Sequence, residues 1–347
     1  MAAIRVLIAE DSPVARELLV SIIEGTPGLQ VVGTARNGAE AVRLAKRLEP
    51  DVIVMDVYMP EMDGFEATRR IMAETPRPIV LVSASFAKNE HDLTFNALKS
   101  GALSVLEKPT LLDPPERYGL LISQLKLMAE VKVVRRWLEP AKPSITSQVV
   151  PEPVLQRQNG KSKLKLVAMA SSTGGPGVLA QILGQLPADL PLPILVVQHI
   201  TRGFSSGLAT WLNQQTALNV GLAGQGDEPQ PGQVLIAPDD RHMVINRMGL
   251  ISLTQEPPHH GLRPSADYLF NSVAQVYGAT AVGVILTGMG ADGAEGLRAL
   301  RNTGAPTIAQ DKDSCVVFGM PAVAIELGAA AQVLPANRIA AAIMMML

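Results

Sequence analysis

Cysteine and aromatic residues are both scarce in this 347-residue sequence. Cys315 is its only cysteine, which excludes an internal disulfide and a metal cluster built from cysteines. Aromatic residues make up 3% of the chain, too few for the stacking platforms that bind single-stranded nucleic acids. These shortages remove disulfide scaffolds and single-strand binders from the classes of protein to be considered.

An excess of charge of one sign and long apolar runs are also missing. The formal net charge is −2, from 30 basic and 32 acidic residues, which argues against a nucleic-acid partner. No apolar run reaches the roughly 18 to 20 residues of a membrane span. The opening stretch "MAAIRVLIAED" meets an acidic pair too early for a secretory signal. We therefore expect a soluble, cytoplasmic protein that binds no nucleic acid and does not insert directly into a membrane.

Apolar residues are abundant, at 47% of the chain, and the length predicts two domains. Short β-branched runs alternate with amphipathic stretches over residues 1–137 and again over 161–347. This alternation predicts an α/β fold with two doubly wound domains, each a parallel sheet covered by helices on both faces. Residues 138–160 are rich in Pro, Ser and Gln and lack apolar periodicity, so we interpret them as a flexible linker.

Charged side chains stand at the ends of predicted strands in the first half. Glu10 and Asp11 follow the first strand and Asp56 ends the third, so these carboxylates would meet at the carboxyl edge of the sheet. Mg²⁺ fits such a cluster best, because the carboxylates would otherwise raise one another's pKa. Ser83 can donate to a phosphoryl oxygen, and Lys108 supplies a compact cation for it. Each carboxylate taken alone could instead be an ordinary solvated loop group.

The stretches "LIAEDS", "VIVMDVYMPEMDG", "VLVSAS" and "LEKP" resemble response-regulator receiver domains. The resemblance implies a flavodoxin-like fold in which a partner histidine kinase or a small phosphodonor phosphorylates Asp56, while Ser83 and Lys108 bind the phosphoryl group. The residues implied to hold Mg²⁺ are Glu10, Asp11, Asp56 and the carbonyl of Tyr58. Many receivers carry an aromatic switch residue three positions before the lysine, where this chain has Val105, so we expect a different relay.

The second half contains a glycine turn, "ASSTGGP", between a predicted strand and a predicted helix. Gly174 and Gly175 permit a sharp turn with exposed N–H groups, and the helix N-terminus adds positive potential beside Ser172. Such a turn favours an anion. If the anion is a phosphate, Ser172 is a helix cap, whereas if it is a tetrahedral oxyanion, Ser172 is a nucleophile.

A nucleophilic serine needs a base and an acid on the same sheet edge. His199 ends the apolar strand "PILVVQHI", and Asp292 follows the strand in "AVGVILTGMG". Taken singly, His199 could be a loop histidine and Asp292 could cap the helix predicted over "GAEGLRALRNTG". Three strand ends converging in one crevice favour hydrolysis, and the glycine turn lacks both the P-loop tail and the dinucleotide-binding spacing.

Three other histidines receive no catalytic role, because they stand in polar, loop-like contexts: His242, His259 and His260. The adjacent pair His259 and His260 has no carboxylate at ligand spacing in the sequence. We therefore expect no zinc site there.

The stretches "ASSTGGP", "VVQHI", "LIAP", "RPSAD", "LTGMGADGAEG" and "AQDKDSCVVFGMP" resemble the catalytic domain of the chemotaxis protein-glutamate methylesterase and glutamine deamidase family. With the receiver in front, the resemblance extends over nearly the whole chain. It implies a Rossmann-like domain with a triad of Ser172, His199 and Asp292. It also implies an oxyanion hole at the Met289 amide, with Thr173 matching the residue after the nucleophile.

The resemblance further implies hydrolysis of glutamate methyl esters on methylated chemoreceptors, releasing methanol, and deamidation of receptor glutamines, with no cofactor for the ester chemistry. Two departures from the family pattern change residues at the rim of the site: Ala170-Ser171 replaces the usual Gly-Ala before the nucleophile, and Thr201-Arg202 replaces a usual Pro-Pro.

We expect the unphosphorylated receiver to cover the crevice at Ser172 and so to inhibit the enzyme. The rival interpretation is a phospho-switched module that binds a phosphate or nucleotide without hydrolysing anything.

Overall fold

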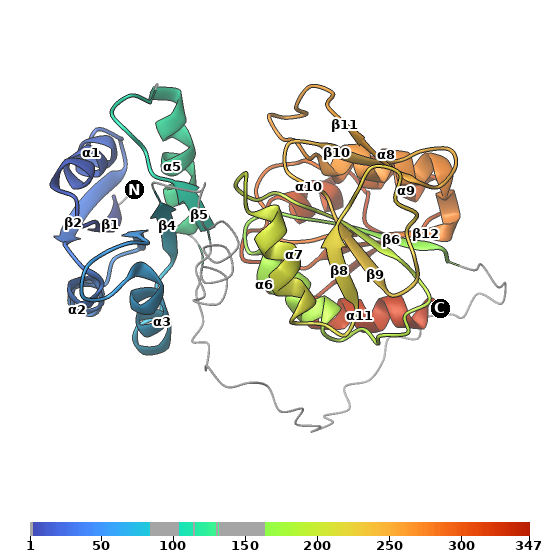
Figure 1. Cartoon of the computed structure of the whole chain (residues 1–347), viewed down its shortest axis with the longest axis horizontal. Coiled ribbons are helices and arrows are strands. Elements are labelled where there is room, and N and C mark those ends of the chain that lie inside the picture. Colours follow the sequence, from blue (N-terminus) through green and yellow to red (C-terminus); the bar gives the residue numbers. More distant parts are fainter. Residues whose placement is uncertain (1–2, 84–103, 114, 130, 132–163) are drawn as a thin grey trace.

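The computed structural model describes residues 3–83, 104–113, 115–129, 131 and 164–347, which form two bodies of sheet and helix (Figure 1). The linker predicted at 138–160 lies outside the described residues. No helix in the described ranges is both long and apolar enough to cross a membrane.

The N-terminal sheet has five parallel strands in the order β2-β1-β3-β4-β5. Its strands are β1 (Ile4–Ala9), β2 (Leu29–Ala35), β3 (Val52–Asp56), β4 (Ile79–Ser83) and β5 (Ser104–Glu107). The described helices around it are α1 (Pro13–Glu24), α2 (Gly38–Leu48), α3 (Gly64–Glu74) and α5 (Pro115–Met128). Buried side chains of α2 and α3 pack on one face of the sheet, and those of α1 and α5 pack on the other. The expected doubly wound parallel sheet is confirmed.

Each of the first three helices begins at a residue whose side chain caps it. Ser12, Asn37 and Asp63 accept hydrogen bonds from backbone N–H groups three residues ahead, at 3.4, 2.8 and 2.7 Å. These oxygens satisfy donors that a helix leaves unpaired at its first turn. The caps therefore fix where the chain leaves the carboxyl edge of the sheet.

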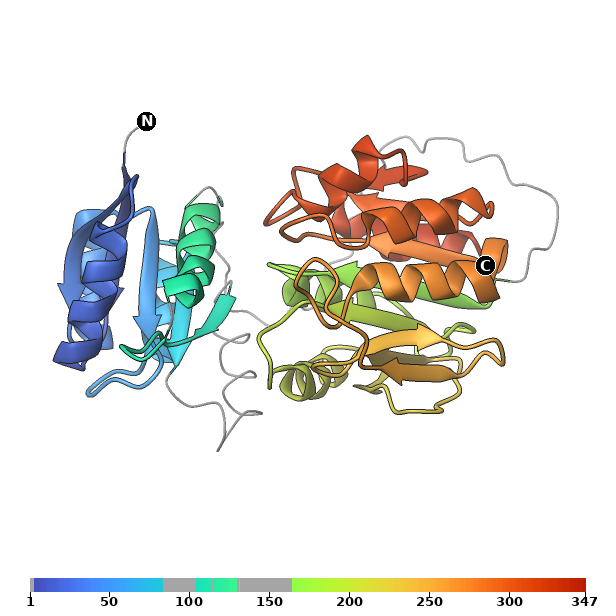
Figure 2. The same ribbon diagram turned by 90° about the horizontal axis from the view of Figure 1, so that it is seen from above.

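The C-terminal sheet has seven parallel strands in the order β14-β13-β12-β6-β7-β9-β8 (Figure 2). Its strands are β6 (Leu166–Ser171), β7 (Ile194–Gln198), β8 (Asn219–Leu222), β9 (Gln233–Ile236), β12 (Ala281–Ile285), β13 (Thr307–Gln310) and β14 (Gln332–Leu334). The helices are α6 (Gly175–Leu183), α7 (Ser205–Asn213), α8 (Ala266–Val276), α9 (Ala294–Asn302), α10 (Met320–Glu326) and α11 (Ala336–Met345), with a short 3₁₀ turn, η1 (Gly278–Thr280).

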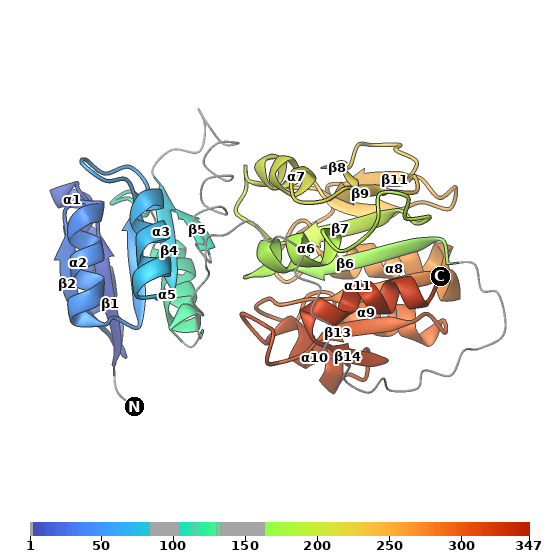
Figure 3. The ribbon, with the colours of Figure 1, turned by 90° about the horizontal axis from the view of Figure 1, so that it is seen from below.

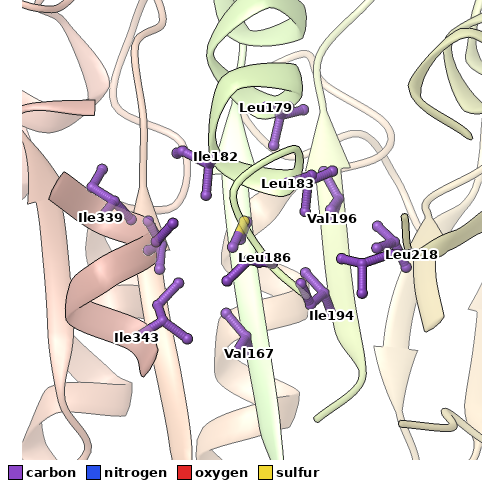
Figure 4. Packing of buried hydrophobic residues seen from close by; sticks show 14 of the residues in the cluster. Val167, Leu179, Ile182, Leu183, Leu186, Ile194, Val196, Leu218, Ile339 and Ile343 are labelled. Atoms are coloured by element: carbon purple, nitrogen blue, oxygen red, sulfur yellow. The ribbon is translucent and has the colours of Figure 1, made fainter. Parts of the chain in front are cut away.

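Two apolar layers sandwich this sheet. Side chains of α6, α7 and α11 bury one face, where Val167, Ile182 and Ile343 lie together (Figure 4). Side chains of α8, α9 and α10 bury the other face, with Phe270 at the centre. Figure 3 shows the two helical layers from below. Because both faces are covered, the strands are almost continuous apolar runs, as expected for a parallel sheet.

A two-stranded antiparallel hairpin, β10 (His242–Ile245) with β11 (Ile251–Thr254), stands apart from the main sheet. The sequence interpretation placed His242 in a polar loop, and the structure corrects this. The imidazole is fully buried, accepts a 3.2 Å hydrogen bond from the Ser265 N–H at Nδ1, and stacks on Tyr268 with 3.9 Å between ring centroids. His242 is thus a core residue that packs the hairpin against α8.

The strand order places three chain segments side by side at one edge. β6 lies between β7 and β12, with Ser171 in register with Gln198 and Ala170 in register with Ile285. The segments that follow these strands therefore leave the sheet next to one another. A crevice outside the carboxyl ends, where the strand order reverses, is where ligands bind in open α/β sheets.

The two bodies contact each other through the segment after β7. The Thr201 hydroxyl donates a 2.5 Å hydrogen bond to the Val105 carbonyl of β5. Phe204 is 1% exposed and belongs to the same apolar cluster as the α2 and α3 side of the N-terminal sheet. On the other side, Val317 joins the cluster that contains α5.

Candidate functional site

Ser172 follows β6 directly and opens a turn that only glycine can complete. Gly174 has φ +77°, and a Cβ on it would lie 2.4 Å from the Val316 side chain. A Cβ on Gly175 would lie 2.1 Å from the Gln198 side-chain oxygen. The Ser172 N–H donates to the Thr287 carbonyl at 3.0 Å, which ties the turn to the segment after β12. The predicted strand-to-helix turn therefore places the Ser172 backbone at the carboxyl edge of the sheet.

Gln198, the last residue of β7, joins the Ser172 turn to the His199 segment. Its side-chain N–H₂ donates to the carbonyls of Ser172 and His199, both at 2.7 Å. Its side-chain oxygen accepts a 2.6 Å hydrogen bond from the Ser171 hydroxyl. Gln198 lies within the stretch "VVQHI", and no role was predicted for it. A polar amide at the end of an apolar run, next to a histidine, was the available signal in the sequence.

Asp292 lies 1% exposed and faces the imidazole of His199, with 2.8 Å between Nε2 and Oδ2. The Ser265 hydroxyl donates to Oδ1 and the Ala266 N–H donates to Oδ2, both at 2.6 Å. Burial alone would raise the pKa of Asp292, but the contacts with His199, Ser265 and Ala266 outweigh it and lower that pKa to about 2. The carboxylate is therefore held ionised against the imidazole.

The alternative role considered for Asp292, capping the helix that follows it, is wrong. That helix, α9, has Gly293 at its N-cap and no side-chain cap. Asp292 instead accepts hydrogen bonds from the first turn of α8, a helix that precedes it in the chain by about 25 residues. Ser265 was quoted in "RPSAD" without a role, because capping between distant segments leaves no local pattern.

The orientation of His199 leaves its other ring nitrogen for chemistry. Because Nε2 faces Asp292, Nδ1 is the nitrogen that could take a proton from a hydroxyl. Both ring nitrogens are buried and neither has a partner in hydrogen-bond geometry in the described part of the chain, so the 2.8 Å contact of Nε2 with Asp292 is an ion-pair contact. Likewise, no hydrogen bond joins the Ser172 hydroxyl to His199 among these residues. Such catalytic contacts often tighten only when substrate binds.

Two backbone N–H groups near Ser172 point to an oxyanion site. Within residues 164–347, no acceptor is found for the N–H of Thr173 or of Met289. The turn that carries Met289 is held because the Gly288 carbonyl accepts from Gly319 and Met320, at 3.1 and 2.9 Å. Free N–H groups on a fixed turn are the donors that stabilise a developing oxyanion.

The N-terminal body gathers the predicted carboxylates at its own carboxyl edge. One ligand atom each from Glu10, Asp11 and Asp56 lies within 4.8 Å of the others. Lys108 Nζ lies 2.8 Å from Asp56 Oδ2 and 2.9 Å from Glu10 Oε2. Burial raises the pKa of Asp56 and of Glu10, while the Lys108 ammonium opposes both shifts. Burial would lower the pKa of Lys108, but its two carboxylate partners raise it.

The chemistry of this cluster fits a divalent cation. Asp56 Oδ1 is buried and has no hydrogen-bond partner among the described residues, and the same holds for the Ser83 hydroxyl at the end of β4. Tyr58 lies two residues after Asp56, beside that carboxylate in the chain. Oxygen ligands from a few carboxylates, with room for water beside the exposed Asp11, suit Mg²⁺.

Comparison with known proteins agrees with this architecture. The family model described as CheB methylesterase matches residues 167–343, and the response regulator receiver domain model matches residues 6–114. The described parallel sheets lie within these two ranges, except that β1 begins two residues before the receiver match and β6 begins one residue before the methylesterase match.

Relatives match along almost the full length. The chain is 49% identical to the protein-glutamate methylesterase/protein-glutamine glutaminase 1 of Syntrophus aciditrophicus, over 97% of this chain and 96% of that protein. It is 47% identical to the corresponding protein of Nitrosospira multiformis, over 98% of this chain and 96% of that protein. The crystal structure of the Thermotoga maritima CheB methylesterase catalytic domain superposes with a TM-score of 0.52 at 40% identity, covering 53% of this chain and 99% of that one.

The family models, the full-length relatives and the solved catalytic domain favour a hydrolase over a phosphate- or nucleotide-binding module. The chain belongs to the CheB methylesterase family and carries a response regulator receiver domain before its catalytic domain.

Proposed function

We propose that this protein is a phosphorylation-activated serine hydrolase that demethylates glutamate methyl esters on chemoreceptors and deamidates receptor glutamines. The observation that carries the proposal is the buried 2.8 Å contact of His199 with Asp292, beside the glycine turn of Ser172. The full-length relatives, named protein-glutamate methylesterase/protein-glutamine glutaminase, support the substrate class. Both activities attack a γ-carbonyl of a glutamyl side chain, so one site serves both.

In the proposed reaction, the Ser172 hydroxyl attacks the ester carbonyl while His199 Nδ1 takes its proton. Asp292 stabilises the imidazolium that forms, because it stays ionised and is held by Ser265 and Ala266. His199 then returns the proton to the departing methoxide, and methanol leaves. Water hydrolyses the acyl-enzyme by the same sequence, which frees Ser172. With a glutamine substrate, ammonia leaves in place of methanol.

The N–H groups of Thr173 and Met289 are assigned to the oxyanion of the tetrahedral intermediate. Both belong to segments fixed by backbone hydrogen bonds, which supports a preorganised site. Removal of one such donor typically costs about 2.7–4 kcal/mol of transition-state stabilisation.

We assign Asp56 as the phosphorylated residue, with a histidine kinase or a small phosphodonor as the source. Glu10, Asp11, Asp56 and the Tyr58 carbonyl would hold Mg²⁺, which when bound neutralises charge on the carboxylates and the phosphoryl oxygens. Lys108 pairs with Asp56 before phosphorylation and with a phosphoryl oxygen afterwards. The unpartnered Ser83 hydroxyl donates to another phosphoryl oxygen. The ester chemistry itself needs no cofactor.

The receiver is proposed to inhibit the catalytic domain until it is phosphorylated. Thr201, which contacts Val105, is two residues after His199, and Val317 joins the receiver cluster from a segment whose carbonyl accepts from Gly288. The receiver therefore contacts the segment that follows His199 and the segment that is hydrogen-bonded to Gly288. Phosphorylation adds nearly two negative charges at Asp56, which changes the faces around it.

The domain boundaries proposed are a receiver over residues 1–137, a flexible linker over 138–160 and a catalytic domain over 161–347. The ranges of the two family matches fall inside the outer boundaries. Because the proposed phosphodonor is a histidine kinase of a two-component pathway, we expect the enzyme to act in the cytoplasm.

Labelling with a serine-reactive fluorophosphonate, followed by peptide mapping, tests the proposed nucleophile. We expect the label on Ser172 and its loss in Ser172→Ala. Ser171→Ala is the matched control, because the neighbouring hydroxyl is engaged with Gln198 and should not react. Turnover of a methylated receptor should fall by about 10⁴ to 10⁶ in Ser172→Ala. Labelling that survives in Ser172→Ala would refute the assignment.

A further inference from the structure

A second cluster of ligand-type side chains lies in the catalytic domain, outside the triad. One ligand atom each from His259, His260 and Asp267 lies within 4.8 Å of the others. The sequence interpretation expected no zinc site at His259 and His260, because no carboxylate stood at ligand spacing. The structure overturns that reason: Asp267, in the first turn of α8, folds back against the two imidazoles.

Asp267 brings a carboxylate oxygen that lacks a hydrogen-bond donor. The residue is 3% exposed, and its Oδ1 accepts a 2.7 Å hydrogen bond from the Gly296 N–H. Oδ2 is buried, and no hydrogen-bond partner for it is found in the described part of the chain. It lies 3.3 Å from His259 Nε2, which is close enough for an ion pair but is not in hydrogen-bond geometry. A buried anionic oxygen without a donor is costly unless a cation compensates it.

A tight turn presents the two histidines. Backbone hydrogen bonds between His259 and Leu262, of 3.0 and 2.8 Å, close it, and the ring centroids of His259 and His260 are 4.1 Å apart. His260 adopts φ +51°, a left-handed conformation that is uncommon for residues other than glycine. Non-glycine residues held in such conformations cluster at functional sites.

The cavity beside Asp267 is rich in acidic groups. It has a volume of about 450 Å³, and its lining includes Glu256, Glu295, His259 and Asp267. The described residues that line it include no lysine or arginine. The nearby Arg263 is engaged elsewhere, because its guanidinium donates to Asp240 at 2.6 and 2.9 Å. A positive charge inside this cavity would therefore be stabilised.

We propose that His259, His260 and Asp267 form a binding site for a transition-metal cation of the Zn²⁺ class. Zn²⁺ accepts imidazole nitrogen and carboxylate oxygen, with bonds of about 2.0–2.2 Å that place neighbouring ligands about 3.3 Å apart. The distance between His259 Nε2 and Asp267 Oδ2 is already 3.3 Å. The Gly296 N–H on Oδ1 orients the carboxylate, and the cavity leaves space for water on the metal. The site does not depend on the proposed esterase activity.

Isothermal titration of the full chain with Zn²⁺ tests the site. The titration is run in excess Mg²⁺, which occupies the oxygen-only cluster of the receiver and leaves the histidine site to Zn²⁺. We expect one Zn²⁺ per chain. His259→Ala, His260→Ala and Asp267→Asn should each weaken binding by at least about tenfold. Glu295→Gln is the matched control, because it removes a carboxylate from the same cavity but not from the cluster.

Visible absorption of bound Co²⁺ gives an independent readout of nitrogen ligation. We expect a d–d band more intense than that of aqueous Co²⁺ in the wild-type chain and in Glu295→Gln, and loss of this extra intensity in His259→Ala. His259 and His260 are partly or fully exposed, so their variants are expected to fold; they decide the result if Asp267→Asn does not. Absence of Zn²⁺ binding in the wild type, or equal Zn²⁺ affinity in both histidine variants and the wild type, would overturn the proposal.

Discussion

Asp292 shows how single residues set the chemistry of the crevice. It accepts hydrogen bonds from the first turn of α8 while its Oδ2 faces His199. A helix N-terminus carries partial positive charge, which favours the ionised carboxylate. Asp292 therefore stabilises the fold by joining its segment to α8. In the proposed mechanism it also holds the imidazole in its reactive orientation.

Asp292 also contributes stability that depends on pH. Its pKa is lowered from 3.8 to about 2, so its contribution is present above the unfolded value and is lost as the pH falls through about 2. A shift of this size corresponds to about 2 kcal/mol for a buried carboxylate. Urea unfolding of the wild type and Asp292→Asn should show an advantage of the wild type that shrinks between about pH 5 and about pH 2. A difference independent of pH would contradict this prediction.

The same variant separates folding from catalysis. Asp292→Asn should lower turnover by about 10⁴ at neutral pH, because an amide favours the wrong tautomer of His199. The measurement is steady-state demethylation by chains shown by circular dichroism to be folded. Turnover within about tenfold of the wild type would contradict the assigned role.

At the scale of elements, Gln198 connects the two segments that follow β6 and β7. Loss of its side chain in Gln198→Ala would leave the carbonyls of Ser172 and His199 without their shared donor. We expect a loss of about 2–4 kcal/mol in the free energy of unfolding and a reduced kcat, because both segments would shift. Thermal unfolding and kinetics of the same preparation measure the two effects.

Ser171→Ala is the matched control for that experiment. It removes only the hydroxyl that donates to the Gln198 oxygen, so the loss should be about 1 kcal/mol with kcat nearly unchanged. If both variants behaved alike, Gln198 would not be the connecting residue.

The elements that the sequence predicted best are those with local patterns. Continuous Val and Ile runs predict buried parallel strands, and strand ends must meet at one edge, so Ser172, His199 and Asp292 could be expected to lie near one another. Contacts between distant segments could not be predicted. Asp292 caps a helix that precedes it, and Asp267 completes a cluster with His259 only because the chain turns back at Gly261.

At the scale of the whole molecule, the contact between the domains joins Val105 and Thr201. From the sequence, Val105 was expected to require a relay other than an aromatic switch, and Thr201 was expected to alter the rim of the site. The two meet through the hydrogen bond from the Thr201 hydroxyl to the Val105 carbonyl. We infer that this contact forms part of the relay between the two domains.

Thr201→Val tests this contact, because it removes the hydroxyl and keeps the shape. If the hydrogen bond stabilises the closed arrangement by about 0.5–1.5 kcal/mol, the unphosphorylated chain should gain about two- to tenfold in activity. The same change in a fragment starting at Lys161 should have no effect, and that fragment should exceed the unphosphorylated full chain. A full-length variant with unchanged basal activity would show that the contact does not restrain the enzyme.

The short segment after β7 carries both His199 and Thr201, the residue that contacts the receiver, so events in the two domains are coupled. Thermodynamic linkage requires that, if phosphorylation of the receiver favours substrate binding, substrate binding favours the phosphorylated state of the receiver by the same factor. A receptor-derived ester analogue that displaces the receiver should increase the affinity of Asp56 for beryllium fluoride. Beryllium fluoride should increase the affinity of the catalytic domain for the analogue by the same factor. The methylated receptor would then be a promoter of its enzyme's phosphorylation as well as its substrate.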